Sequence, residues 1–325
     1  MNDNKLNICQ VSLARDIPII LINFKNFKKI YKKFKIFIIC PKKELQSFKK
    51  KLNFKEFTFI AEEKILPYKK FNFLFNKLCK NIRYKKEFSA RLNWYYQQIL
   101  KISFIINFIE EKNESMIIWD ADTIILKKIN FFSNNYSNKY ATLMEFHKPY
   151  FLTNKEIIGK LPNYFISSLV QFASLTVIEC KFLIKLLKKK NRKSSKLSYW
   201  ITSIVFKSIF KQHKIYNGSL FSEYELIGIS NYLSKKCKQK AIFCLRSGLD
   251  GQLNKYQFLI AKLFNVYHVT YEHSHVNKNS QGMLERKQSW VNFLKIITKD
   301  YLKYSLRNLK NNFYYYLNIR NHKVD

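Results

Sequence analysis

The sequence predicts an α/β protein built on a mostly parallel sheet. Short apolar runs typical of buried strands alternate with longer stretches whose apolar residues recur at helical spacing. This strand-then-helix alternation runs through the first 61 residues without interruption. Strands separated by helices are the pattern of a parallel sheet with crossover helices, and 325 residues are enough to bury a large core.

The N-terminal elements follow from local signals. Asp16-Ile17-Pro18 is a typical helix start, and Pro41 closes an apolar run. We expect strands at residues 7–13, 35–40 and 57–61, and helices at 17–30 and 42–52.

The middle of the chain contains the clearest helix. Apolar residues recur through Ser89 to Glu111, whereas residues 68–88 are basic and aromatic and predict a loop or a weak helix. Met116 to Trp119 predicts a buried strand. In the second half we expect strands at 141–146, 172–178, 240–245 and 266–271, and helices at 181–190, 197–210 and 222–234.

The C-terminal segment from about Ser289 alternates aromatic residues with Lys and Arg. This pattern fits an interfacial helix on an anionic membrane surface, and equally a packed helix carrying exposed lysines. No repeat or Pro/Ser-rich linker interrupts the chain, so we expect one domain over residues 1–285 and a helical tail over 286–325.

The composition is strongly basic, with 59 Lys and Arg against 22 Asp and Glu. Such a charge ordinarily indicates nucleic acid or an anionic membrane. The chain is also rich in the other residues that A- and T-rich codons encode, which offers a compositional explanation. The lysines are spread evenly and no zinc or RRM-like spacing occurs, so nucleic acid is not expected as a partner and a nucleic-acid-binding protein is kept only as an alternative.

Neither export nor membrane spanning is indicated. No signal-peptide pattern opens the chain, and residues 161–178, the longest uncharged run, contain too many polar residues for a span. The six cysteines lack a C-x-x-C pair and predict buried, reduced thiols. We expect a cytoplasmic protein, with peripheral attachment to the inner face of the plasma membrane as an alternative.

The scarcity of glycine excludes several ways of binding phosphate. The chain has 6 Gly and no G-x-G-x-x-G or G-x-x-x-x-G-K motif, so a bound nucleotide would need another device. Asp120 and Asp122 directly follow the predicted strand 116–119. Carboxylates at the carboxyl end of a buried strand suit Mg²⁺ or Mn²⁺ carrying substrate phosphates. The alternative is a pair of aspartates in a surface turn.

Two enzyme classes contain such an acidic pair after a buried strand. The run Asp120-Ala121-Asp122-Thr123 fits the D-x-D-x-T signature of haloacid-dehalogenase-type phosphatases. That class also needs a later acidic pair, and no D-D or G-D-x-x-x-D cluster follows, so it is the second choice.

Four segments together indicate the other class: residues 11–16 (VSLARD), 91–101 (RLNWYYQQILK), 118–123 (IWDADT) and 221–226 (FSEYEL). In order and spacing they resemble a family of bacterial glycosyltransferase-like proteins. The resemblance implies a GT-A fold, with a mixed, mostly parallel sheet and a Rossmann-like nucleotide half. It also implies a divalent metal, Mn²⁺ or Mg²⁺, and a nucleotide-diphosphate sugar.

The resemblance also implies roles for individual residues. Asp122 would bind the metal directly, and Asp120 would contact metal, water or ribose. Arg91 would reach the sugar or phosphates, with a solvated helix-end arginine as the alternative. Arg15 and Asp16 would lie by the nucleoside, unless Asp16 only caps the next helix.

The remaining candidates lie later in the chain. Glu223 or Glu225 would serve the acceptor hydroxyl as base, although Glu225 also fits a capping box begun by Ser222. Gln171 is a candidate sugar contact. His273 and His275 alternate onto one face of an extended segment and would complete the metal site, with solvated or core histidines as the alternative. His147 is a weaker candidate, and Gln97 and Gln98 are assigned structural roles.

These observations predict a metal-dependent glycosyltransferase of hexosyltransferase type. The acceptor would be a saccharide or a lipid-linked saccharide in cell-surface polysaccharide biosynthesis, a setting that only the resemblance implies.

Overall fold

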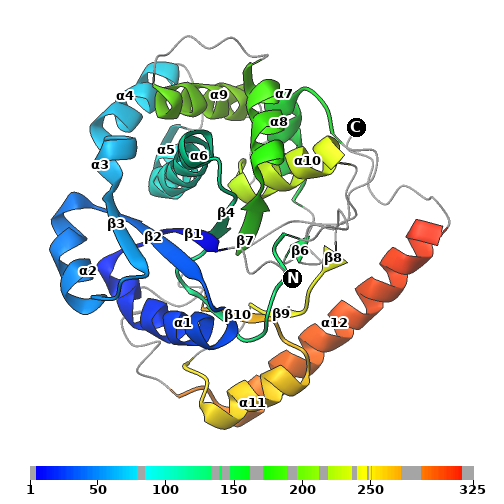
Figure 1. Cartoon of the computed structure of the whole chain (residues 1–325). Helices are drawn as coiled ribbons and strands as arrows, with labels where there is room; N and C mark the ends of the chain where they lie inside the picture. Colours follow the sequence, from blue (N-terminus) through cyan, green and yellow to red (C-terminus); the bar gives the residue numbers. More distant parts are fainter. Residues whose placement is uncertain are drawn as a thin grey trace.

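A five-stranded sheet forms the centre of the molecule (Figure 1). The computed structural model describes residues 5–79, 85–132, 139–140, 147–161, 171–188, 196–211, 219–235, 240–246, 249, 251–271 and 287–316. The strands lie in the order β3-β2-β1-β4-β7. Their bounds are β1 (Leu6–Val11), β2 (Phe34–Cys40), β3 (Phe57–Ala61), β4 (Met116–Trp119) and β7 (Phe172–Leu175).

The sheet is mixed and mostly parallel, as the sequence predicts. Strands β1, β2, β3 and β4 run in one direction, and only β7 is antiparallel to its neighbour β4. Both faces are covered by apolar side chains, which explains why these strands are almost continuous hydrophobic runs.

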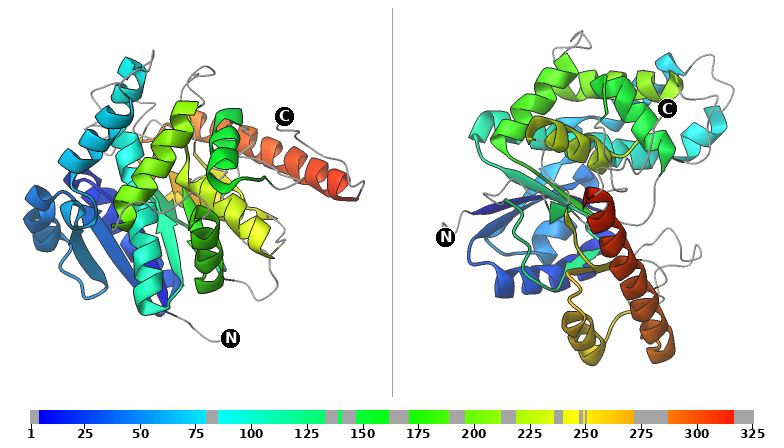
Figure 2. Two further views of the ribbon diagram at one scale, coloured as in Figure 1. Left: turned by 90° about the horizontal axis from the view of Figure 1, so that it is seen from above. Right: turned by 90° about the vertical axis from the view of Figure 1, so that its right-hand side faces the viewer.

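Helices cover both faces of the sheet, as the two further views show (Figure 2). One face packs against α1 (Ile17–Ile30) and α2 (Leu45–Lys51). The other face packs against a larger group of helices. This group comprises α3 (Glu62–Ile65), α4 (Tyr68–Leu78), α5 (Lys85–Ala90), α6 (Leu92–Lys112), α7 (Lys148–Ile158), α8 (Val177–Lys188), α9 (Leu197–Lys211) and α10 (Glu223–Lys235).

A second, three-stranded sheet adjoins the first. Its order is β5 (Thr123–Ile125), β10 (His268–Thr270) and β9 (Cys244–Leu245). Helices α11 (Lys255–Leu263) and α12 (Trp290–Tyr316) share an apolar cluster with this sheet. Strands β6 (Lys139–Tyr140) and β8 (Lys240–Ala241) form a separate parallel pair.

Several expected elements differ from those observed. The segment expected as a loop or weak helix contains α4, because Phe71 and Phe75 repeat at helical spacing and are buried. The strand expected at 172–178 ends at Leu175, and α8 begins two residues later. The strand expected at 240–245 divides between two sheets, as β8 and β9.

Some elements were not expected at all, namely α3, β5, α7 and α11. The strand expected at 141–146 lies outside the described residues.

The C-terminal segment forms the expected helix, α12. Phe293, Ile296 and Ile297 are buried against the second sheet, so the first turns of this helix belong to an apolar core. The division into a domain over residues 1–285 and a tail over 286–325 stays a prediction.

Two further expectations concern the described residues. Within them, no helix combines the length and the apolarity needed to cross a membrane. Five cysteines, Cys9, Cys40, Cys79, Cys180 and Cys244, are buried free thiols, and Cys237 lies outside the described part of the chain.

Candidate functional site

The strand order creates a switch point between β1 and β4. The chain adds β2 and β3 on one side of β1 and then returns to place β4 on the other side. The segments that follow β1 and β4 therefore leave the sheet in different directions. They do so at the carboxyl ends of the two strands, which is where open α/β sheets bind ligands. The segment after β1 contains Arg15 and Asp16, and the segment after β4 begins with Asp120.

The Asp120-Ala121-Asp122 turn joins the two sheets. Backbone hydrogen bonds hold it on all sides: the Asp120 N–H donates to the Gln171 carbonyl at 2.9 Å, and the Thr123 N–H donates to the Asp120 carbonyl at 3.2 Å. The Tyr271 N–H donates to the Asp122 carbonyl at 2.9 Å. The two carboxylates therefore project from a fixed backbone, Asp120 beside the first sheet and Asp122 beside the second.

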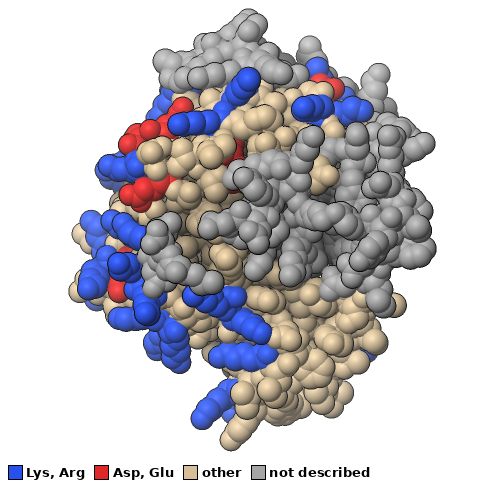
Figure 3. Space-filling view, turned by 45° about the vertical axis from the view of Figure 1, so that its right-hand side comes forward, with Lys and Arg blue, Asp and Glu red and all other residues tan. Residues whose placement is uncertain are grey.

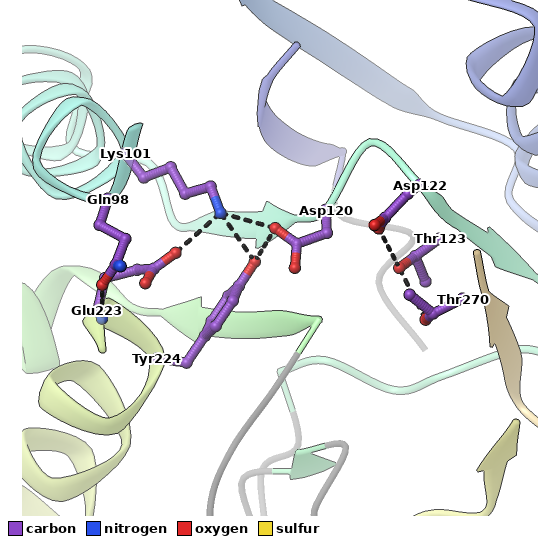
Figure 4. A network of polar contacts seen from close by, with 8 residues as sticks. All are labelled: Gln98, Lys101, Asp120, Asp122, Thr123, Glu223, Tyr224 and Thr270. Carbon is purple, nitrogen blue, oxygen red and sulfur yellow. Dashed lines mark hydrogen bonds and ion pairs between the residues drawn. The ribbon is translucent and has the colours of Figure 1, made fainter. Parts of the chain in front are cut away.

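Asp120 faces α6 and α10, where it meets a buried lysine (Figure 4). The Lys101 ammonium donates to Asp120 Oδ1 at 2.6 Å and to Glu223 Oε1 at 2.8 Å. The Tyr224 hydroxyl donates to the same Asp120 oxygen at 2.6 Å and lies 3.3 Å from Lys101 Nζ. Lys101, Asp120, Glu223 and Tyr224 thus form one network, called here the Lys101 network.

Burial and charge shape the acid–base behaviour of this network. Burial lowers the pKa of Lys101, but the carboxylates of Asp120 and Glu223 outweigh it and the net shift is upward. Burial and the Asp120 charge raise the pKa of Tyr224. Lys101 is therefore a permanent cation and Tyr224 a permanent hydroxyl donor at ordinary pH.

Asp122 lies on the other side of the turn, where it meets a threonine hydroxyl. The Thr123 hydroxyl donates to Asp122 Oδ1 at 3.3 Å and lies 2.9 Å from the Thr270 hydroxyl. Because Thr123 has one hydroxyl proton, Thr270 donates to Thr123 in this chain. Figure 4 shows these residues on the opposite side of the turn from the Lys101 network.

An aromatic cluster lies beneath the turn. The buried Trp119 ring stacks on Phe172 and meets the His268 ring edge to face. His268 is fully buried, and neither ring nitrogen has a hydrogen-bond partner in the described structure. Burial lowers the pKa of His268 to about 3, so this imidazole is neutral.

The segment after β1 is also fixed by hydrogen bonds. The Leu13 N–H donates to Asp16 Oδ2 at 2.8 Å, and the Ala14 N–H donates to Glu44 Oε2 at 2.6 Å. Asp16 makes no side-chain capping bond to α1 itself, and its bond to Leu13 instead caps the short 3-10 turn Ala14–Asp16 that leads into α1. Arg15 lies 3.8 Å from Asp16, with 65% of its side chain exposed.

Buried polar atoms gather near the same sheet edge. Gln10, Ser12 and Gln171 are each at most 3% exposed. Among the described residues, neither amide atom of Gln10 has a hydrogen-bond partner, and the same holds for Ser12 Oγ and Gln171 Oε1. Gln171 also adopts a left-handed backbone with φ of 67°. Unsatisfied buried groups and backbone strain are both features that cluster at ligand sites.

The other expected site residues take varied positions. Arg91 is exposed immediately before α6. Glu223 and Glu225 are both buried in the first turn of α10, and the Glu225 N–H donates to the Ser222 hydroxyl at 3.4 Å, as half of a capping box would require. His147 lies next to α7, 2.5 Å from the Ser219 carbonyl. His273 and His275 lie outside the described residues.

Sequence reasoning missed Lys101 and Tyr224. The available signal for Lys101 was a lysine in the apolar run Ile99-Leu100-Lys101-Ile102, where every neighbour is buried. Gln98, which was assigned a structural role, is buried, and its side-chain oxygen accepts the Glu223 N–H at 3.1 Å.

The acidic residues fit a hard divalent cation in part. Asp120 and Asp122 are half-buried, and both hydrogen bonds to the Asp120 carboxylate reach Oδ1. The described residues contain no cluster of three or more His, Cys, Asp or Glu side chains able to hold a metal. Mg²⁺ in proteins is usually bound by one or two carboxylates together with water and substrate phosphates.

Fold and site together define an α/β protein with a carboxylate pair at the switch point of a mostly parallel sheet. The chain belongs to a family of unknown function (DUF6492), which matches it over residues 10–232. The match includes the segments after β1 and β4, the whole of α6 and the first turns of α10.

Solved structures similar to the chain include glycosyltransferases. Mouse xyloside xylosyltransferase 1 is 11% identical with a TM-score of 0.42, over 85% of this chain and 99% of that one. The galactosyltransferase LgtC, in complex with donor and acceptor sugar analogs, is 10% identical with a TM-score of 0.38, over 90% and 96%. WbbM, a bifunctional glycosyltransferase, is 8% identical with a TM-score of 0.37, over 93% and 52%.

No curated protein matches the chain.

Proposed function

We propose that this protein is a metal-dependent glycosyltransferase that moves a sugar from a nucleotide-diphosphate donor to a saccharide or lipid-linked acceptor. The observation that carries the proposal is the position of Asp120 and Asp122 at the switch point, where α/β sheets bind nucleotides. The motif resemblance supports the same class.

In this proposal each side of the switch point binds one part of the sugar donor. Asp122 and Asp120 Oδ2 would hold Mn²⁺ or Mg²⁺, which when bound neutralises charge on the departing diphosphate. Arg15 and Asp16 follow β1 and would contact the nucleoside. The exposed Arg91 would reach the phosphates or the sugar, and Gln171 the sugar, while His273 or His275 would complete the metal site.

A carboxylate of α10 would accept the proton of the acceptor hydroxyl. Glu223 and Glu225 are the candidates, and both lie in the helix turn that borders the Lys101 network. Glu223→Gln and Glu225→Gln separate the two: loss of the base lowers kcat while nucleotide binding is retained. Turnover at the wild-type rate in both variants would contradict the assignment.

Calorimetric binding of UDP and of GDP tests the proposal directly. Wild type is expected to bind one of them in Mn²⁺ and neither in EDTA, and the Asp120→Ala/Asp122→Ala variant is expected to bind neither. Absence of binding to both nucleotides in wild type would contradict the proposal and favour the phosphatase or nucleic-acid alternatives.

We also propose that α11 and α12 dock on an anionic lipid surface, which would place a lipid-linked acceptor near the site. Apolar residues of both helices face outward: Tyr256, Leu259, Leu263, Val291, Leu294, Leu302 and Leu306. Exposed Lys295, Lys299 and Lys303 alternate with them on α12. On the face that Figure 3 shows, a broad uncharged area lies beside a row of Lys and Arg.

Charge favours lipid over a second copy of this chain as the occupant, because two copies each carry +37 and repel. Sedimentation with vesicles containing phosphatidylglycerol is expected to capture wild type and to lose Leu294→Gln/Leu302→Gln. Phe73→Gln, at an exposed apolar residue of α4, is the control. Equal capture of all three proteins would contradict this docking surface.

A further inference from the structure

The Lys101 network contains a cation that the proposed chemistry does not use. Lys101 is 3% exposed although it lies on a helix between apolar residues. Burying an ammonium costs several kcal/mol unless it is paired and fully hydrogen-bonded, so its presence requires a reason.

The hydrogen bonds of Lys101 exclude a direct role in binding phosphate. An ammonium has three N–H donors. Asp120 Oδ1, Glu223 Oε1 and the Tyr224 hydroxyl accept them at 2.6, 2.8 and 3.3 Å, and Nζ also lies 4.9 Å from the centre of the Tyr224 ring. Every donor is therefore satisfied by the protein itself, and none remains for a ligand.

The same bonds fix the orientation of Asp120. Its Oδ1 accepts from Lys101 and from Tyr224, two donors that come from different helices. The backbone of Asp120 is fixed as well, through its bond to Gln171. With one carboxylate oxygen and the backbone both held, the direction of Oδ2 is set before any ligand arrives.

We propose that Lys101 is a positioning residue for the sugar-donor site, which orients Asp120 through Oδ1 and leaves Oδ2 to the metal-bound nucleotide. This inference rests on the proposed function. Two physical effects support it: a carboxylate that is already ordered loses less freedom when it binds, and partners in the outer shell of a metal site tune its ligands.

The inference also assigns Glu223 a part in the network. Glu223 takes the second Lys101 donor and so balances the charge of the buried ammonium. It makes no hydrogen bond to Asp120, so its loss leaves both bonds to Asp120 Oδ1 in place. Glu223→Gln is therefore the matched control for Lys101.

The experiment compares wild type, Glu223→Gln, Lys101→Met and the double variant Lys101→Met/Glu223→Gln. Methionine keeps most of the lysine volume, and the double variant removes the buried Glu223 charge together with the cation, so that only the half-buried Asp120 carboxylate remains. Circular dichroism and thermal unfolding verify the fold of each protein. Calorimetric binding of UDP or GDP in Mn²⁺, and in EDTA, measures the site without requiring turnover.

Glu223→Gln is expected to bind the nucleotide within about threefold of wild type, whereas the double variant folds but binds at least about tenfold more weakly in Mn²⁺, a difference of about 1.4 kcal/mol. A folded double variant with wild-type affinity overturns the positioning role and leaves the proposed function intact. Should the double variant not fold, Tyr224→Phe, which removes the other donor to Oδ1, must weaken binding or the inference fails. Wild type without metal-dependent binding overturns both proposals.

Discussion

The two sides of the Asp120-Ala121-Asp122 turn differ in how they hold a carboxylate. Asp120 is held by a buried cation and a phenol from two helices, whereas Asp122 accepts from the Thr123 hydroxyl, which Thr270 contacts in turn. The Lys101 cation cancels part of the charge of the Asp120 carboxylate. Asp120 is therefore oriented and partly neutralised by Lys101, whereas in the proposed site Asp122 is the direct ligand of the metal.

The largest expected effect follows from this difference. Asp122→Ala is expected to weaken Mn²⁺-dependent nucleotide binding about 1,000-fold, or about 4 kcal/mol, because in the proposed site it removes the direct metal ligand. Asp120→Ala is expected to cost about tenfold, since only Oδ2 serves the ligand. Calorimetry on the two single variants measures both effects, and the reverse order would break the comparison.

The side of the turn that contains Thr123 and Thr270 is also expected to lose stability in acid, because of His268. Its folded pKa of about 3 lies below the usual value of 6.5, so the unfolded chain binds a proton more readily and stability falls as pH drops from about 6.5 to 3. His268→Phe removes this term. At pH 4 the variant should therefore gain roughly 3 kcal/mol relative to wild type, compared with their difference at pH 7.5.

Urea unfolding of both proteins at the two pH values provides the measurement. Phenylalanine suits this position because Trp119 and Phe172 already surround it. A pH-independent difference between the proteins would show that His268 is not the titrating group.

On the charged side, Tyr224→Phe tests one hydrogen bond. The substitution keeps the ring and removes the hydroxyl that donates to Asp120 at 2.6 Å. Hydrogen bonds to charged groups are worth about 1.5–3 kcal/mol, so we expect a loss of about 2 kcal/mol in the free energy of unfolding. Thermal or urea unfolding measures this loss, and an unchanged stability would show that the network contributes nothing through Tyr224.

The smallest expected effect is that of Thr270→Val, on the side of the turn that contains Thr123. This substitution removes the hydroxyl that lies 2.9 Å from Thr123 and preserves the side-chain shape. A neutral hydrogen bond contributes about 1 kcal/mol, so stability should fall by about that amount, with a smaller change in nucleotide binding than Tyr224→Phe causes. A larger loss than in Tyr224→Phe would remove the distinction between the two sides.

The sequence predicted the first sheet and the place of the acidic pair well. Strand β4 was expected at its observed bounds, because four apolar residues are bracketed by polar ones. Strand β5 was not expected, since three residues are too few to show a strand period, and the two-residue strands β8 and β9 were merged for the same reason.

The sequence could indicate only those site residues whose positions follow from nearby sequence. Asp120 and Asp122 could be proposed because they come at the end of a strand, and Arg15 and Asp16 because their segment after the first strand resembles a known family. The Lys101 network joins residues separated by up to 123 positions, and no local pattern indicates which helix faces meet. Lys101 itself is hidden by the strong apolar periodicity of α6, which gives no reason to single out one lysine in a lysine-rich chain.

The junction between the two sheets also sets the order in which the site can be completed during synthesis on the ribosome. The Lys101 network needs the chain only as far as Tyr224, but Thr123 meets Thr270, which is 147 residues further along. Contacts between such distant residues form late because the intervening loop must first be closed. The Lys101 network can therefore form on the nascent protein before Thr270 has been synthesised, whereas the contact that supports Asp122 through Thr123 can form only afterwards.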